Sequence, residues 1–149
     1  MAKGASKDVV IKNGELVSGI VDYLDKKKVK VFRLPVQSKN PILILFNAII
    51  ISFIILVYNI SIVHARSRAP AWSCFLATRF TFRKFVTTYH GTYNFNNKIK
   101  KFYNSIMVRS DLVIAGSNFI FSHINQNYGN FFLKKKKKTF SNFFYNTFL

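Results

Sequence analysis

Apolar and polar positions change their period several times along the chain, and each change predicts an element. Residues 29–34 alternate apolar and polar, which is typical of a strand. The short segments 85–89 and 112–115 are rich in β-branched, aromatic or aliphatic residues and predict two further strands. Residues 69–79 are compatible with a helix that carries Pro70 in its first turn, where proline is tolerated.

Two more helices follow from the spacing of apolar residues. Residues 98–109 carry apolar side chains at i, i+3, i+4 and i+7, with lysines off that stripe, which predicts an amphipathic helix with a basic outer face. Ser117 suits the cap of a last helix that ends near Tyr128. Strands that alternate with helices in this way predict an α/β fold, a parallel sheet covered by helices on both faces. The stripe comprises Ile99, Phe102, Tyr103 and Ile106.

The segment 42–63 contains no charged residue over 22 positions and has two interpretations. It is long enough for one membrane span of ~20 residues, and the cations that precede it would keep the N-terminus in the cytoplasm. Alternatively the chain breaks at Tyr58–Asn59, giving a buried helix over 42–57 and a short central strand over 60–64. Hydropathy alone does not decide, because buried parallel strands are also almost continuously apolar. The alternation that follows favours the helix and strand.

The charge of the chain points to an anionic partner. Its 23 Lys and Arg face five acidic residues, giving a net charge of +18, which suits nucleic acid, a phosphorylated substrate or an anionic lipid surface. An AT-rich coding sequence explains the excess lysine as well as an anionic partner does. Aromatic residues interleave with lysines over 131–149, as in proteins that stack single-stranded bases, but no nucleic-acid motif accompanies them. We therefore expect no specific nucleic-acid partner, and nonspecific binding stays an alternative.

Several chemical classes lack support in the sequence. The single cysteine, Cys74, reads most simply as a core thiol, and the three histidines do not have zinc-site spacing. No Gly-x-Gly-x-x-Gly or Walker loop is present, so we predict neither a metal nor a cofactor. The first ten residues lack the apolar segment of a secretory signal, which indicates a cytoplasmic setting.

Three loops fall at the carboxyl ends of predicted strands, where open parallel sheets bind their ligands. They are residues 64–70, 90–95 and 115–118. Arg66 and Arg68 lie in the first of these loops, next to the amide groups that begin a helix, and this combination suits a phosphate or a carboxylate. The alternative is that both arginines decorate a surface loop.

His90 ends a strand and precedes Gly91. A histidine there can hydrogen-bond a substrate hydroxyl or phosphate near neutral pH, and glycine allows a tight turn or a close approach of the ligand. The alternative is a histidine satisfied by local backbone. We expect structural roles for His64, which closes a buried strand, and for His123, within the last helix. Asp111 is the one acid in this region, so no Ser/His/Asp arrangement is predicted.

The segments VHARSRAPAWS, FVTTYHGTYNF and KKFYNSIMVRSDLVIAGSNFI, with LPVQSKNP before them, resemble the N-terminal domain of family-4 glycosyltransferases over about residues 10–129. The resemblance implies half of a GT-B fold, in which two Rossmann-like domains face each other across a cleft. The N-terminal domain chiefly binds the acceptor, here a cell-envelope glycan or a lipid-linked acceptor, and the C-terminal domain chiefly binds the nucleotide-sugar donor. Such enzymes often dock at the inner face of a membrane through basic and apolar patches.

The resemblance also assigns roles. His90 matches the histidine near the transferred sugar, the candidate catalytic residue, and Gly91 matches the glycine beside it. The remaining matched positions are candidate substrate-binding residues: Arg66 and Arg68 in the basic turn, and Ser117 and Asn118 at the start of the last helix.

The chain also departs from the family pattern. It begins at what resembles the second strand, and nothing after Gly129 resembles the linker or the donor domain. The position before VHAR is commonly Asp in the family and is Ile62 here. We therefore expect 1–129 to be a domain incomplete at its N-terminus, 130–149 to be a disordered or out-of-frame tail, and the fragment to be inactive alone.

Overall fold

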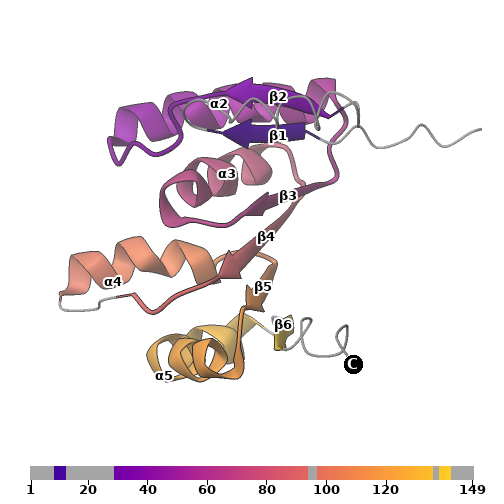
Figure 1. Cartoon of the computed structure of the whole chain (residues 1–149). Helices are drawn as coiled ribbons and strands as arrows, with labels where there is room; N and C mark the ends of the chain where they lie inside the picture. Colours follow the sequence, from indigo (N-terminus) through magenta and orange to yellow (C-terminus); the bar gives the residue numbers. More distant parts are fainter. Residues whose placement is uncertain (1–8, 13–28, 94–96, 136–137, 142–149) are drawn as a thin grey trace, which may run out of the picture.

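The strands form two parallel sheets in the computed structural model, which describes residues 9–12, 29–93, 97–135 and 138–141 (Figure 1). In the first, β1 (Val9–Lys12) pairs with β2 (Lys30–Arg33). The second has the order β3-β4-β5-β6, with every neighbouring pair parallel. The predicted α/β class, a partial Rossmann-like fold, is confirmed, although two sheets stand in place of one. The strands of the second sheet are β3 (Ile62–Ala65), β4 (Lys84–Tyr89), β5 (Leu112–Ala115) and β6 (Lys138–Ser141).

The apolar run divides into a helix and a strand. Helix α2 spans Pro41–Val57, and the Asn40 side chain caps it by accepting a hydrogen bond from the Ile42 N–H at 2.9 Å. The helix ends at Tyr58, and Asn59 turns the chain with a φ of 48°, so β3 starts in a new direction. Among the described residues, no helix is long and apolar enough to cross a membrane. Residues 42–63 are therefore not one continuous helix.

Helix α2 is buried on one face only, which corrects the expectation of a buried helix. Its inner face packs against α3 (Arg68–Phe80) and includes Ile51 and Ile55, each 1% exposed. Asn47 is also buried and donates its side-chain N–H to the Pro35 carbonyl at 3.0 Å. The outer face is apolar as well, so the uncharged run supplies both the buried face of α2 and its exposed face. The exposed large side chains of α2 are Ile42, Leu43, Leu45, Phe46, Ile49, Phe53, Leu56 and Val57.

Strand β3 is not the central strand that the sequence predicted. In the described part of the chain it pairs with β4 alone and forms one edge of the second sheet. Ile62 and His64 are exposed, whereas Ala65 is buried.

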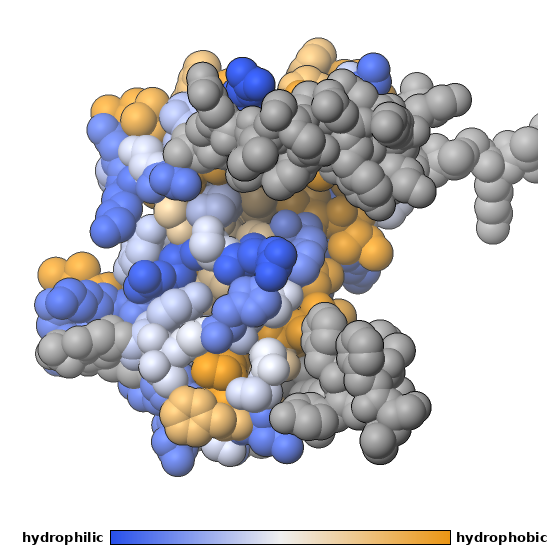
Figure 2. All heavy atoms as spheres, viewed as in Figure 1, coloured by the Kyte–Doolittle hydropathy of each residue, from blue (hydrophilic) through white to orange (hydrophobic). Residues whose placement is uncertain are grey.

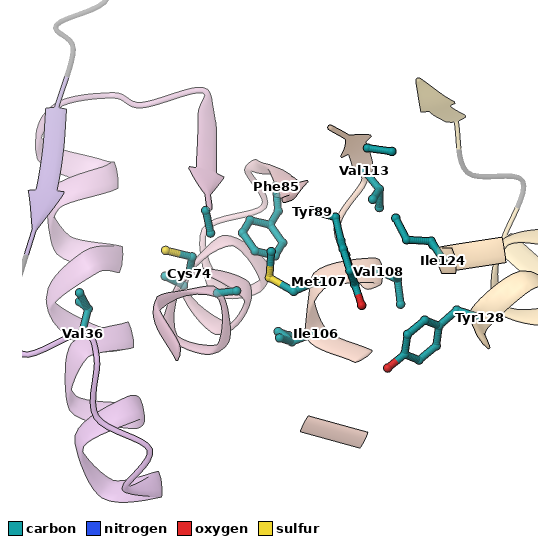
Figure 3. Close-up of a cluster of buried hydrophobic side chains, with 14 of the residues drawn as sticks. Val36, Cys74, Phe85, Tyr89, Ile106, Met107, Val108, Val113, Ile124 and Tyr128 are labelled. Atoms are coloured by element: carbon teal, nitrogen blue, oxygen red, sulfur yellow. The ribbon is translucent and has the colours of Figure 1, made fainter. Parts of the chain in front are cut away.

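A continuous core joins β4 and β5 to helices α3 and α5 (Asn118–Lys135). Figure 3 shows Phe85, Met107 and Tyr89 in its middle. Cys74 is buried at its border, as expected of a core thiol, and burial raises the pKa of this thiol to about 12.

The segment 98–109 is not one amphipathic helix. Helix α4 ends at Asn104 (Lys98–Asn104), and the chain tightens into a 3-10 turn over Ser105–Val108. Ile106 and its two successors are buried, whereas Ile99 is 79% and Phe102 60% exposed, so the predicted stripe is wrong in its first turn. The change of helix type rotates the later residues onto the core.

The last helix is longer than predicted. Helix α5 passes the expected end near Tyr128 and reaches Lys135. The domain boundary predicted after Gly129 therefore falls inside α5, and β6 in the predicted tail pairs with β5. The other tail positions, 136–137 and 142–149, lie outside the described residues.

Candidate functional site

The carboxyl ends of β3, β4 and β5 meet at one edge of the second sheet. The register aligns Ala65 with Thr87 and Tyr89 with Ala115, so the loops that follow these strands are neighbours. The Gly116 N–H donates to the Tyr89 carbonyl at 3.1 Å and extends the ladder one step into the loops. Parallel pairing alone therefore gathers the predicted site residues, as it does in other open α/β sheets.

Arg66 and His90 are in direct contact at this edge. The Arg66 Nε–H donates a hydrogen bond to His90 Nε2 at 3.2 Å, and both side chains are exposed. Accepting this bond requires a lone pair on Nε2, which places the imidazole proton on Nδ1. His90 is thus oriented by a cation from the neighbouring loop rather than by local backbone.

Two glycines flank His90, and open space lies over one of them. A Cβ built on Gly91 would meet no atom within 4 Å, and its φ lies outside the left-handed region, so space rather than turn geometry distinguishes this glycine. A Cβ on Gly116 would stand 3.8 Å from His90 Nδ1 and 3.5 Å from the Tyr89 carbonyl oxygen. The imidazole Nδ1 therefore faces a residue without a side chain.

Arg68 is held by structural partners. Its Nη1 donates to Asn104 Oδ1 at 2.8 Å, and its guanidinium carbon lies 4.3 Å from the centre of the Tyr93 ring. Tyr93 in turn packs on Tyr89 with ring centres 4.5 Å apart. Arg68 therefore ties the start of α3 to α4 and to the loop after β4, while its charge stays near the site.

His64 stands beside the same edge but has a different setting. Its Nε2 lies 2.7 Å from Thr88 Oγ1, a hydrogen bond between β3 and β4 that fits the structural role expected for it. Its exposed position on the edge strand β3, however, differs from the burial that the sequence predicted. Desolvation, followed by the charges of Arg66 and His90, lowers the pKa of His64 below its usual value.

Ser117 and Asn118 lie where β5 passes into α5. Ser117 caps this helix as predicted, with its Oγ accepting from the Ile120 N–H at 3.2 Å. Asn118 begins the helix and is exposed. Their place in the loop after Ala115 puts them on the side of His90 opposite Arg66.

Asn104, Tyr93 and Gly116 complete the surroundings of the site and were not predicted. Asn104 is buried to 1% exposure and Tyr93 is half-buried. The glycine in the segment AGSN, directly after a predicted strand, was the one usable signal. Nothing local links Asn104 to Arg68, which lies 36 positions away.

The site is electropositive. The sequence has no carboxylate between Lys26 and Ser110, and Asp111 binds the Phe85 N–H at the opposite edge of the sheet. In the described part of the chain, no three His, Cys, Asp or Glu side chains gather as metal ligands. Arginine side chains and a histidine N–H can bind phosphate or sugar oxygens directly.

Comparison with known proteins agrees with this geometry. The sequence profile described as Glycosyltransferase Family 4 matches residues 16–137. The chain belongs to this family. It is similar to a solved structure, the crystal structure of glycosyltransferase from Rickettsia africae ESF-5, with 46% identity and a TM-score of 0.66. The similarity covers 83% of this chain and 32% of that one, so the chain spans about a third of its relative's length. A search of curated proteins gives no match.

Proposed function

We propose that this chain forms the acceptor-side half of the active site of a glycosyltransferase with the GT-B arrangement. The observation that carries the proposal is the contact of Arg66 with His90 at the carboxyl edge of the sheet, in a member of glycosyltransferase family 4. In this proposal His90 is the catalytic residue that lies against the transferred sugar. Open space over Gly91 leaves room for the reacting sugar of the acceptor beside His90.

The remaining site residues bind and position the substrate. Arg66 orients the imidazole and leaves its Nη groups for a phosphate or hydroxyl oxygen. Arg68 braces the loop through Tyr93 and Asn104 and adds positive potential. Ser117 and Asn118 contribute polar groups from the far side of His90.

The nucleotide-sugar donor is bound mainly by a second domain. Diphosphate departure needs charge stabilisation and positioning from groups facing His90 across a cleft, and these effects supply most of the acceleration in transfer reactions. We therefore expect residues 1–149 alone to bind acceptor without turning over a nucleotide-sugar.

The acceptor is a lipid-linked sugar or a cell-envelope glycan made at the inner face of a membrane, as in polysaccharide biosynthesis. Support comes from the outer face of α2, where eight large apolar side chains are exposed. Some apolar residues are visible between hydrophilic ones at the upper border of the molecule in Figure 2, where Figure 1 places α2. Exposed Arg33 and Lys39 precede the helix, and the chain carries a net charge of +18. An apolar face with nearby cations suits an anionic bilayer surface.

Acceptor binding to purified 1–149 tests the site. Isothermal titration with a polyprenyl-diphosphate sugar is expected to show binding that His90→Ala and Arg66→Ala each weaken on the order of tenfold, about one charged hydrogen bond. Lys84→Ala is the matched control, because Lys84 is an exposed cation at the other end of β4. Equal losses in the control, or no loss in either site variant, would contradict the proposal. Robust sugar transfer by 1–149 would contradict its inactivity.

Membrane docking is tested separately with vesicles. Cosedimentation with vesicles containing phosphatidylglycerol is expected to fall strongly in Ile49→Asp/Phe53→Asp, which places two carboxylates on the outer face of α2. Ile99→Asp is the control, because Ile99 is an exposed apolar residue on α4. Equal binding of both variants would show that charge alone attracts the chain to lipid.

A further inference from the structure

The loop after β4 is anchored at both ends by tyrosine rings. Tyr89 ends the strand and is buried in the core (Figure 3), and the ring of Tyr93 packs on it with ring centres 4.5 Å apart. An extended strand would hold side chains four positions apart at ~13 Å, so the chain turns sharply between the two tyrosines. His90 and Gly91 lie in this turn. The ring contact therefore fixes where the loop leaves the sheet and where it returns.

Tyr93 is also held from the side of α3. The guanidinium carbon of Arg68 lies 4.3 Å from the centre of the Tyr93 ring, and Nη1 of Arg68 donates to Asn104 Oδ1 at 2.8 Å. Asn104 is buried, so it is a fixed point for this contact. A guanidinium that stacks on an aromatic ring and is hydrogen-bonded to a buried amide has little freedom to move. Tyr93 thus joins the loop after β4 to both the core and α3.

The hydrogen bond between Arg66 and His90 gives weaker support to the loop. Its length of 3.2 Å is at the upper end of the usual range, and both side chains are exposed, so water competes for each of them. Gly91, next in the chain, places no side-chain restraint on the backbone. We infer that the contact forms because the loop already holds His90 close to the end of β3.

We propose that Tyr93 is a positioning residue for His90. Its ring, in contact with Tyr89 and Arg68, sets the loop so that the imidazole stands within reach of Arg66. The aromatic ring carries this role rather than the hydroxyl group, because both contacts are made by the ring. The use of His90 in sugar transfer rests on the function proposed above, whereas its positioning is a property of the chain and is measured without acceptor.

The test follows the proton on the His90 imidazole, because its place reports the contact with Arg66. Nitrogen-15 spectra of purified 1–149 at pH 8 are expected to show the proton on Nδ1. Tyr93→Leu keeps an apolar side chain and removes the aromatic ring. It should lower the ratio of the Nδ1–H form to the Nε2–H form on the order of threefold, as the loss of one cation–π contact predicts. Tyr93→Phe keeps the ring and should keep the ratio.

Phe75→Leu is the matched control for general loosening of the fold. Phe75 is also half-buried, and the guanidinium carbon of Arg79 lies 5.1 Å from the centre of its ring. Its aromatic neighbour is Phe85, near the opposite end of β4 from His90. Phe75→Leu should therefore leave the tautomer unchanged, even where it lowers stability in urea as much as Tyr93→Leu does.

The outcomes separate positioning from function. An unchanged tautomer in Tyr93→Leu, or an equal shift in Tyr93→Phe or Phe75→Leu, would overturn the proposal. A wild type without the Nδ1–H form would also overturn it, because His90 would then not be held against Arg66. If the proposed function holds, Tyr93→Leu should in addition weaken acceptor binding. A shifted tautomer with unchanged acceptor affinity would support the positioning and contradict the proposed role of His90.

Discussion

Arg66 and His90 are 24 positions apart in the sequence and joined by a hydrogen bond of 3.2 Å from Nε to Nε2. The contact exists because β3 and β4 are parallel and in register, so their carboxyl ends lie side by side. A strand-end arginine thereby fixes which nitrogen of a strand-end histidine carries the proton. The site therefore depends on both the loop after β3 and the loop after β4.

The first prediction concerns the tautomer of His90. Nitrogen-15 spectra of the imidazole at pH 8 should show the proton on Nδ1, because Nε2 accepts from Arg66. Arg66→Ala should shift the balance toward the Nε2–H form that predominates in free histidine. His90→Gln identifies the signals by their loss. An unchanged tautomer in Arg66→Ala would show that the contact does not orient the ring in solution.

Arg68 should matter for stability more than Arg66. It donates to the buried Asn104 side chain and stacks on Tyr93, and charged hydrogen bonds with a cation–π contact are worth ~1–3 kcal/mol together. We expect Arg68→Ala to lower the free energy of unfolding in urea by about 1–2 kcal/mol, since the side chain is half-exposed. Arg68→Lys should lose about half as much, because lysine keeps the charge without the planar fork.

Arg79→Ala serves as the control for this measurement. Arg79 is an exposed arginine in the last turn of the same helix, and its removal should change stability by ~0.5 kcal/mol or less. Equal losses for the two arginines would mean that the contacts of Arg68 contribute nothing specific.

Acidification should destabilise the fold through His64. Its pKa is lowered in the folded state by desolvation, Arg66 and His90, so the unfolded chain binds the proton more tightly. Stability should therefore fall as the pH drops below the ordinary value of 6.5 and level off below the folded value. Urea unfolding at several pH values should show a smaller acid loss in His64→Gln. A loss identical to the wild type would exclude His64 as its source.

Asp111 should hold the starts of β4 and β5 together. Its Oδ2 accepts from the Phe85 N–H at 2.9 Å, and its own N–H donates to the Phe85 carbonyl at 2.8 Å. Asp111→Ala deprives a backbone donor at the core of its partner and should cost ~1–3 kcal/mol in urea unfolding. Asp111→Asn keeps an acceptor oxygen and should cost clearly less. Equal costs would show that charge, not the hydrogen bond, matters here.

Local patterns predicted the elements well but not their surroundings. Some features depend on only a few neighbouring residues each: the break at Tyr58–Asn59, the strand ending at Tyr89 and the cap at Ser117. The exposure of α2 and the edge position of β3 depend on which elements lie beside them. Hydropathy identifies an apolar side chain, but it does not identify which other element of the fold covers that side chain, or whether any does.

The residues of the site also fall into a group that local sequence predicted and a group that depends on tertiary contacts. Arg66 and His90 were predictable because each follows a strand, and parallel strands bring such positions together. The partners of Arg68 were not, because Asn104 reaches it only where α4 gives way to a 3-10 turn. Ile106 and its two successors are buried in this turn, and the regular spacing of the stripe gave no sign of the change of helix type.

The last prediction separates binding from folding at Gly91. A Cβ there would meet no atom within 4 Å, so Gly91→Ala should unfold at the same urea concentration as the wild type or slightly above it. If the acceptor's sugar occupies this space, the added methyl group should weaken acceptor binding on the order of tenfold. Gly129→Ala is the matched control in α5, where the new methyl group meets chiefly the flexible Asn125 side chain and favours the helix by ~0.5–1 kcal/mol. It should leave acceptor affinity unchanged. Should Gly91→Ala bind acceptor as well as the wild type does, the acceptor does not pass over Gly91, and the role proposed for this glycine is wrong.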